Sequence, residues 1–108
     1  MKIRQREVWK DKSPGFEQDH WFVVLSGQER LDRQKAGQIN ALACFTLRGE
    51  LLSTDVRLNG ADGFSAPTAC QCDLVWFLNK SMLHSKLGEV CGERQRVIKS
   101  KLKEVLRL

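Results

Sequence analysis

The apolar residues of this chain gather in short runs, and this limits the folds that it can adopt. The longest runs, Trp21 to Leu25 and Leu74 to Leu78, have about a quarter of the ~20 residues that a membrane-spanning helix needs. Turn-forming pairs such as Pro14-Gly15, Asn59-Gly60 and Asp62-Gly63 separate the runs. We therefore expect short strands joined by tight turns, and no segment that crosses a membrane.

The pattern of residue types predicts about five strands. Arg6–Asp11 alternates charged and apolar residues, which is typical of a half-buried strand. Trp21–Ser26 is aromatic and β-branched without a polar interruption, as in a strand buried on both faces. Residues 28–38 are strongly polar and suit a loop or one helical turn. The other predicted strands are 39–47, 51–58 and 67–78, the last of which we expect to bend near Asp73.

The last segment, Glu93 to Leu108, changes to a helical period. Its apolar residues recur at the spacing of one helix face, and they are Val97, Ile98, Leu102, Val105 and Leu106. Short strands followed by one helix pack most simply as a small twisted barrel capped by that helix. With 108 residues the chain can build a single core. We expect one domain over residues 1–108, mainly β with a C-terminal α-helix.

The positive charge lies at the two ends of the chain. The formal net charge is +5, from 18 Lys and Arg against 13 Asp and Glu. Residues 93–108 hold six basic and two acidic residues, and residues 1–12 hold five basic and two acidic residues. Residues 13–92 are left with a net charge of −2. The excess charge alone is therefore no evidence for a nucleic-acid groove in the middle of the chain.

The cysteines and the N-terminus indicate a reducing compartment. The first seven residues are charged and lack the apolar stretch of a signal peptide, so we expect a cytoplasmic protein with reduced thiols. The spacing of Cys70 and Cys72 lacks the two- to four-residue gap of a zinc knuckle, and the position of His84 does not require it as a ligand. We expect no metal site and no cofactor.

Six short segments occur in an order that carries a resemblance. They are Glu7-Val8-Trp9, Gly15-Phe16-Glu17-Gln18, Val23-Val24-Leu25-Ser26, Ala43-Cys44-Phe45-Thr46, Cys72-Asp73 and Gly88-Glu89-Val90. Each alone occurs by chance in many chains, but six in this order over nearly the whole chain are a stronger signal. In this order they resemble the PemK/MazF family, the small toxins of bacterial toxin–antitoxin pairs.

The resemblance implies an SH3-like β-barrel that pairs as a homodimer and cleaves single-stranded RNA at short sequences without a metal. The RNA's own 2′-hydroxyl attacks the adjacent phosphorus, so the protein supplies a base, an acid for the leaving oxygen and donors for the developing charge. The implied partner is a small antitoxin protein whose disordered tail covers the RNA groove.

The resemblance also implies roles for particular residues. Thr46 matches the family's threonine, which donates to the scissile phosphate, and Asp73 matches a carboxylate that acts as general base. His20 replaces the family's arginine; an imidazole can act as acid or base near neutral pH, and Asp73 or Glu17 is a candidate partner for it. We expect these three residues, His20, Thr46 and Asp73, to be catalytic. The implied RNA-binding residues are Glu7, Phe16, Glu17, Gln18, Gln71 and Trp76.

His20 and Gln71 both stand where the family has an arginine, and these departures keep alternatives open. Gln71 stands in place of a second arginine and cannot neutralise a phosphate. Two alternatives to the endoribonuclease therefore remain. One is a catalytically degenerate module that binds RNA or protein, and the other is a topoisomerase poison of the CcdB type that acts through the C-terminal helix. Trp76 is likewise either a base-stacking residue or, as is commoner, a core or interface residue.

Overall fold

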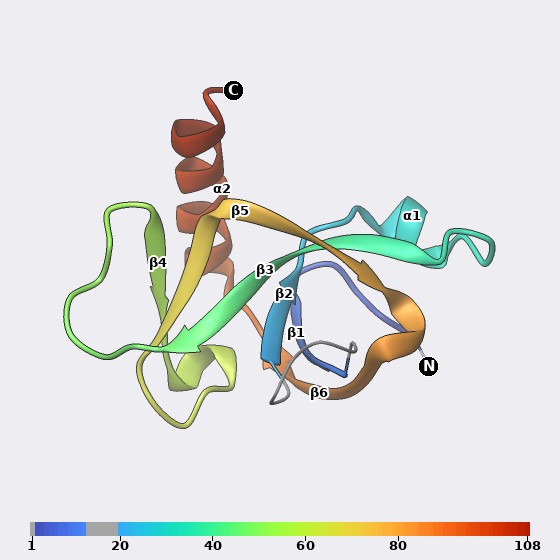
Figure 1. Ribbon diagram of the computed structural model, residues 1–108, viewed down its shortest axis with the longest axis horizontal. Helices are drawn as coiled ribbons and strands as arrows, with labels where there is room; N and C mark the ends of the chain where they lie inside the picture. The colour runs from blue at the N-terminus through green and yellow to red at the C-terminus, as the bar shows by residue number, and fades with distance from the viewer. Residues whose placement is uncertain (1, 13–19) are drawn as a thin grey trace.

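The computed structural model describes residues 2–12 and 20–108 (Figure 1). Within these residues, none of the helices is both long and apolar enough to cross a membrane. The elements in chain order are β1 (Glu7–Asp11), β2 (His20–Val24), α1 (Gln28–Asp32), β3 (Gln38–Thr46), β4 (Asp55–Leu58), the 3₁₀ turn η1 (Gly60–Asp62), β5 (Thr68–Asn79), the 3₁₀ turn η2 (Lys80–Met82), β6 (Leu83–Glu89) and α2 (Gly92–Leu106).

The strands form one antiparallel sheet in the order β4-β5-β3-β2-β1-β6. The sheet is open in its hydrogen bonding, with β4 and β6 as its edges. It is curled so that the turn after β4 touches β6: a Cβ added at Gly88 would lie 2.7 Å from the carbonyl oxygen of Asp62. An Asp62 carboxylate oxygen also accepts a hydrogen bond of 2.9 Å from the Cys91 N–H. The mainly-β fold with a C-terminal helix is confirmed, and the predicted barrel is a curled sheet that does not close.

The longest pairing in the sheet joins β3 to β5, and it contains the predicted bend. Leu42 pairs with Val75, whereas Cys44 pairs with Cys70. Residues 71–74 of β5 therefore face a single residue of β3, which bends β5 around Asp73 (Figure 1). The bend lets β5 pair with β3 along its length and with the short β4 at one end.

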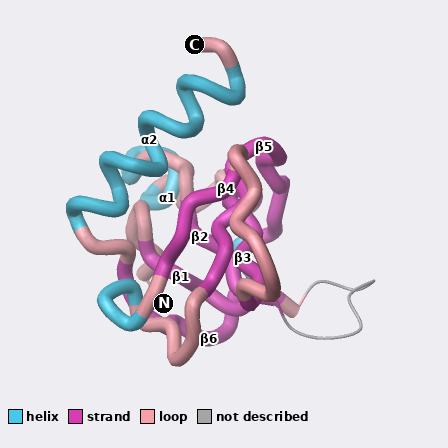
Figure 2. The backbone as a smooth tube through the Cα atoms, turned by 90° about the vertical axis from the view of Figure 1, so that its left-hand side faces the viewer, coloured by secondary structure: helices cyan, strands magenta, loops and turns pink. Residues whose placement is uncertain are grey.

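Strand alternation gives the sheet two apolar faces with separate cores. One core contains Val8, Val23 and Leu42 and includes Ile98 of α2, which is fully buried. The other contains Trp9 and is closed by residues near the N-terminus and in α1. Figure 2 shows α2 lying along the outside of the sheet, and it packs against β4 and β5. Of the predicted helical stripe, Ile98, Leu102 and Val105 pack against the first core, whereas Val97 and Leu106 are exposed.

Two elements differ from the sequence expectations. β6 was not predicted, because most of its side chains are exposed at the sheet edge and it carries few apolar residues. The predicted strand at 51–58 is shorter and begins at Asp55. The polar segment 28–38 does contain one helical turn, as predicted, but its single leucine, Leu31, is buried in the second core.

Candidate functional site

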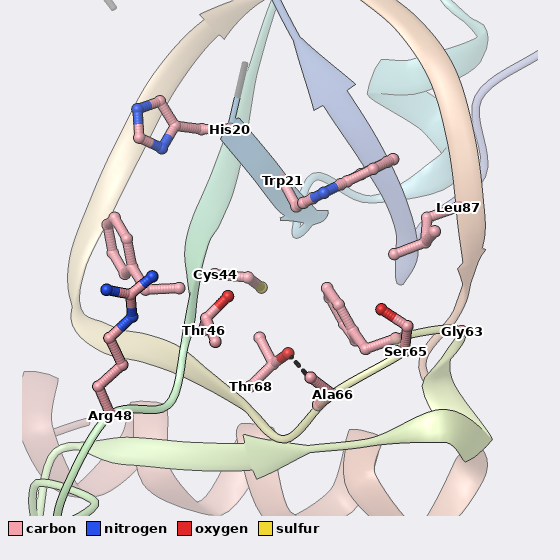
Figure 3. Close-up of a pocket in the computed structure, with 12 residues that line it drawn as sticks. His20, Trp21, Cys44, Thr46, Arg48, Gly63, Ser65, Ala66, Thr68 and Leu87 are labelled. Atoms are coloured by element: carbon pink, nitrogen blue, oxygen red, sulfur yellow. Dashed lines mark hydrogen bonds between the residues drawn. The ribbon is translucent and has the colours of Figure 1, made fainter. Parts of the chain in front are cut away.

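A pocket of about 530 Å³ lies where β2 begins and β3 ends (Figure 3). Its lining comes from six parts of the chain: the start of β2, the end of β3, the segment after β3, the segment between η1 and β5, the start of β5, and β6. The residues are His20, Trp21, Cys44, Phe45, Thr46, Arg48, Gly63, Phe64, Ser65, Ala66, Thr68 and Leu87.

Strand alternation divides the side chains between the two sides of the pocket. Figure 3 shows His20 and Arg48 on one side of β3, and Trp21 and Ser65 on the other. The His20 ring meets the ring of Phe45 edge to face, with 6.0 Å between the centres. Because neighbouring residues of a strand point to opposite faces, the end of β3 offers groups to both sides.

The polar groups of the pocket suit an anionic ligand. Thr68 donates its hydroxyl hydrogen to the Ala66 carbonyl at 2.9 Å and is therefore already engaged. In the described part of the chain, no hydrogen bond or ion pair engages the Thr46 hydroxyl or the Arg48 guanidinium, and both residues are exposed. A guanidinium, a hydroxyl donor and an imidazole together suit a phosphate ester.

The Trp21 side chain lines the pocket and is in contact with the ammonium group of Lys10. The Lys10 ammonium nitrogen lies 4.9 Å from the centre of the Trp21 ring, within the range of a cation–π contact. Trp21 and Lys10 are opposite one another on β2 and β1. This pair places a further positive charge beside the pocket.

The structure brings together two of the three residues predicted to be catalytic. His20 and Thr46 line the same pocket. Asp73 is exposed on the bent part of β5 and is not part of the pocket lining. Burial raises the pKa of the Asp55 carboxyl group, and the charge of Asp73 adds to that rise, so Asp73 lies near Asp55 of β4.

The other predicted RNA-binding residues have different positions. Gln71 lines a second pocket of about 330 Å³ that shares Thr46 and Arg48 with the first. Trp76 is partly buried against the second core, with its ring edge to face with Phe22. Its surroundings are those of a packing residue. Phe16, Glu17 and Gln18 lie outside the described residues, as does any pairing of Glu17 with His20.

Glu7 is buried in a polar network away from both of these pockets. One carboxylate oxygen lies 2.6 Å from the Lys86 ammonium, and the other accepts hydrogen bonds from the Arg4 N–H at 2.7 Å and the Trp9 indole N–H at 3.1 Å. Burial alone would raise the pKa of Glu7, but these donors together hold it below its usual value. Glu7 therefore ties β1 to β6.

Sequence reasoning missed Arg48, Ser65 and Thr68. Arg48 follows Thr46 by two residues. If the predicted strand at 39–47 had been extended to residue 48, this spacing would have placed both side chains on one face. Thr68 reaches the pocket because it pairs with Thr46 across β3 and β5, and Ser65 lies in the segment that leads into β5; no local pattern indicates either position. Among the described residues, no group of three or more His, Cys, Asp or Glu side chains is arranged to hold a metal ion.

Comparison with known proteins gives structural matches but no sequence matches. No protein-family model and no curated protein sequence matches the chain. A mycobacterial endoribonuclease solved in complex with its cognate antitoxin is 19% identical, with a TM-score of 0.80 over 99% of this chain and 95% of that one. The Mycobacterium tuberculosis toxin MazF-mt6 is 15% identical, with a TM-score of 0.79 over 95% of this chain and 98% of that one.

A chain of the MazE–MazF structure from Deinococcus radiodurans is 19% identical, with a TM-score of 0.78 over 100% of this chain and 99% of that one. These similarities extend over the whole chain, from β1 to α2. The chain therefore has the fold of MazF-type toxins.

Proposed function

We propose that this protein is the toxin of a toxin–antitoxin pair and that it cleaves single-stranded RNA without a metal ion. The observation that carries the proposal is the pocket whose lining includes His20, Thr46 and Arg48. The whole-chain likeness to MazF-type toxins supports it. The pocket offers the groups that phosphodiester cleavage needs in place of a metal.

In the proposed reaction Arg48 binds the scissile phosphate and neutralises part of its charge. Thr46 donates a hydrogen bond to a non-bridging oxygen, where negative charge develops. His20 accepts the proton of the RNA 2′-hydroxyl as that oxygen attacks the phosphorus, the leaving 5′-oxygen takes up a proton from solvent, and a 2′,3′-cyclic phosphate results.

The structure supports His20 more strongly than Asp73 as the group that transfers protons. Asp73 is exposed on β5 and is not part of the pocket lining. We therefore assign proton transfer to His20 and treat Asp73 as the residue whose predicted role most needs a test.

Unpaired RNA is the proposed substrate because bases must leave a duplex to be read in such a pocket. We further propose an antitoxin partner, a homodimer and a cytoplasmic location. Two of the similar structures contain a toxin with its antitoxin. The homodimer is supported by the exposed apolar side chains of Leu74, Val75 and Phe77 on β5.

The test is incubation of the purified protein with a long unstructured RNA, with and without a chelator. We expect equal cleavage in both conditions and 2′,3′-cyclic phosphate ends. His20→Ala should lower the rate by about a hundredfold or more, whereas His84→Ala, an exposed histidine on β6, should not change it. Asp73→Asn at the wild-type rate would confirm that Asp73 is not the base. No cleavage by the folded wild-type protein in either condition would overturn the proposal.

A further inference from the structure

Three of the four cysteines form a cluster in the first core. Cys44 comes from β3, and Cys70 and Cys72 come from β5; all three are free and buried. Cys70 is paired with Cys44 across the ladder, and the Cys72 thiol donates to the Cys70 carbonyl at 3.6 Å. Thiols in a core usually act as small apolar groups, but three adjoining thiols can also exchange electrons.

The sheet register places Cys44 and Cys70 directly opposite each other. Further along the same ladder, the Leu47 N–H donates to the Pro67 carbonyl at 3.0 Å, so Leu47 and Pro67 form a hydrogen-bonded pair. Hydrogen-bonded and non-hydrogen-bonded pairs alternate, so Cys44 and Cys70, three positions further on, form a non-hydrogen-bonded pair.

This kind of pair suits a disulfide. In a non-hydrogen-bonded pair the Cα atoms are about 4.5 Å apart and the side chains approach most closely. The Cα separation found in disulfides runs from about 4.4 to 6.8 Å, so the two cysteines can be joined with little movement of the backbone.

Only one member of the cluster is open to a small reagent. Cys44 lines the pocket, and Figure 3 shows its sulfur among the residues that surround the cavity. Cys70 and Cys72 do not contribute to the pocket lining. A small oxidant in the pocket therefore meets Cys44 first.

Positive groups lie on both sides of the cluster, but contact with a neighbouring thiol and burial raise the pKa of both Cys70 and Cys72, so these two residues are thiols at neutral pH. Arg48 and His20 line the same pocket as Cys44. On the other side, Arg6 has a buried guanidinium nitrogen with no hydrogen-bond partner in the described structure. Burial lowers the pKa of Arg6, and its electrostatic contacts with Cys70 and Cys72 act in the opposite direction.

We propose that Cys44 is an oxidation site with Cys70 as its resolving partner, so that a hydroperoxide links β3 to β5 through a disulfide. The Cys44 thiolate attacks one peroxide oxygen, the O–O bond breaks, and a sulfenic acid and water result. Cys70 then attacks the Cys44 sulfur, the S–O bond breaks, and a second water leaves. Two thiols lose two electrons and two protons, and the peroxide is reduced to water.

The disulfide should stabilise the part of the sheet beside the pocket, whether or not RNA is bound. It crosses the sheet two residues from Thr46 and Thr68, which are the next opposed pair lining the pocket. The crosslink fixes this part of the β3–β5 ladder and restricts the unfolded chain. We expect the oxidised protein to melt several degrees higher than the reduced protein.

The experiment treats the folded protein with hydrogen peroxide, blocks remaining thiols under denaturing conditions and maps the tryptic peptides without reduction. Trypsin separates residues 36–48, which contain Cys44, from residues 58–80, which contain Cys70 and Cys72. We expect these two peptides to be linked in the folded protein. In urea the links should be spread over all four cysteines, with Cys91 included.

Three variants identify the partner. Cys72→Ala and Cys91→Ala should keep the link, whereas Cys70→Ala should abolish it and leave a Cys44 sulfenic acid that dimedone traps. Circular dichroism checks that each variant is folded. The proposal fails if the folded wild-type protein forms no link under conditions that fully oxidise Cys91. It also fails if Cys70→Ala forms the link at the wild-type yield.

Discussion

At the scale of single residues, Arg48 gives the pocket a permanent positive charge that the residues predicted from the sequence lack. Gln71 is neutral, and His20 is charged only when it is protonated. Arg48 lies beside Thr46 and reaches both pockets. In the proposed reaction it supplies the positive charge that His20 and Gln71 do not provide at the positions where the family has arginine.

Arg48→Ala should weaken the binding of an uncleavable 2′-O-methyl RNA by about tenfold or more, because a charged hydrogen bond to phosphate is lost. The slope of log affinity against log salt concentration should become shallower by the amount that corresponds to about one phosphate contact. Fluorescence anisotropy between 50 and 200 mM salt measures both. Arg57→Ala is the matched control, since Arg57 is exposed on β4 outside both pockets. An equal loss in the two variants would show that only overall charge matters.

Glu7 contributes to stability in a way that depends on pH. Its pKa in the folded protein is lower than in the unfolded chain, because Lys86, the Arg4 N–H and Trp9 outweigh the opposing effect of burial. The stabilisation is therefore complete above the unfolded pKa of about 4.3 and is lost as the pH falls through the folded value.

Glu7→Gln should lower the free energy of unfolding by about 2 kcal/mol at pH 7, and the difference from wild type should shrink below about pH 4. Urea unfolding at pH 7 and pH 3 measures this. Glu29→Gln, in an exposed pair with Arg33, should change stability by no more than about 0.5 kcal/mol. A Glu7→Gln effect of the same size at both pH values would rule out the ion pair as its source.

At the scale of elements, the contact between η1 and β6 bends the two edges of the sheet toward each other. A side chain at Gly88 would collide with the backbone of Asp62 and Gly63. Gly63 has a φ of 100°, which allows the chain to turn immediately beside β6. The close backbone approach at this point shapes the wall of the pocket formed by Gly63 and Leu87.

Gly88→Ala should destabilise the protein by about 1–3 kcal/mol, because backbone rather than a flexible side chain must move. Gly37→Ala is the control, since a Cβ at Gly37 meets nothing within 4 Å. Urea unfolding compares the two. If both variants matched the wild type, the contact between η1 and β6 would not hold the edges together.

At the scale of the whole molecule, apolar side chains remain uncovered on the bent part of β5. Phe77 is 71% exposed and Leu74 50% exposed, and Val75 lies between them. Val75 and Phe77 are two residues apart on β5 and so share a face of the strand, and exposed apolar side chains that share a face mark an interaction surface. This surface is where we place the proposed homodimer contact.

Phe77→Asp should shift the protein from dimer to monomer at micromolar concentration, because a charge would be buried in the contact. Light scattering coupled to gel filtration measures the mass. Leu108→Asp adds the same charge at an equally exposed apolar residue at the chain end and should leave the dimer intact. A wild-type protein that is monomeric at all concentrations would contradict the homodimer.

The main elements of the fold were predictable because they depend on local patterns. The run from Trp21 to Leu25 is apolar on both sides, and the two cores of the sheet cover both faces of β2. The stripe around Ile98 identified α2 as a helix with one buried face. β6 was not predictable in the same way, because an exposed edge strand needs few apolar residues and is held mainly by its backbone pairing with β1.

The sequence by itself determined five of the six strands and the terminal helix, since each depends on residues close together in the chain, while His20 and Thr46 became candidates through the resemblance. Only the tertiary structure decided which of the candidates meet. Thr68 joins Thr46 through the pairing of β3 with β5, Ser65 lines the same pocket from the segment before β5, and Asp73 is not part of the lining. Distances between residues far apart in the chain depend on register and curvature, and no local pattern of residue types encodes these.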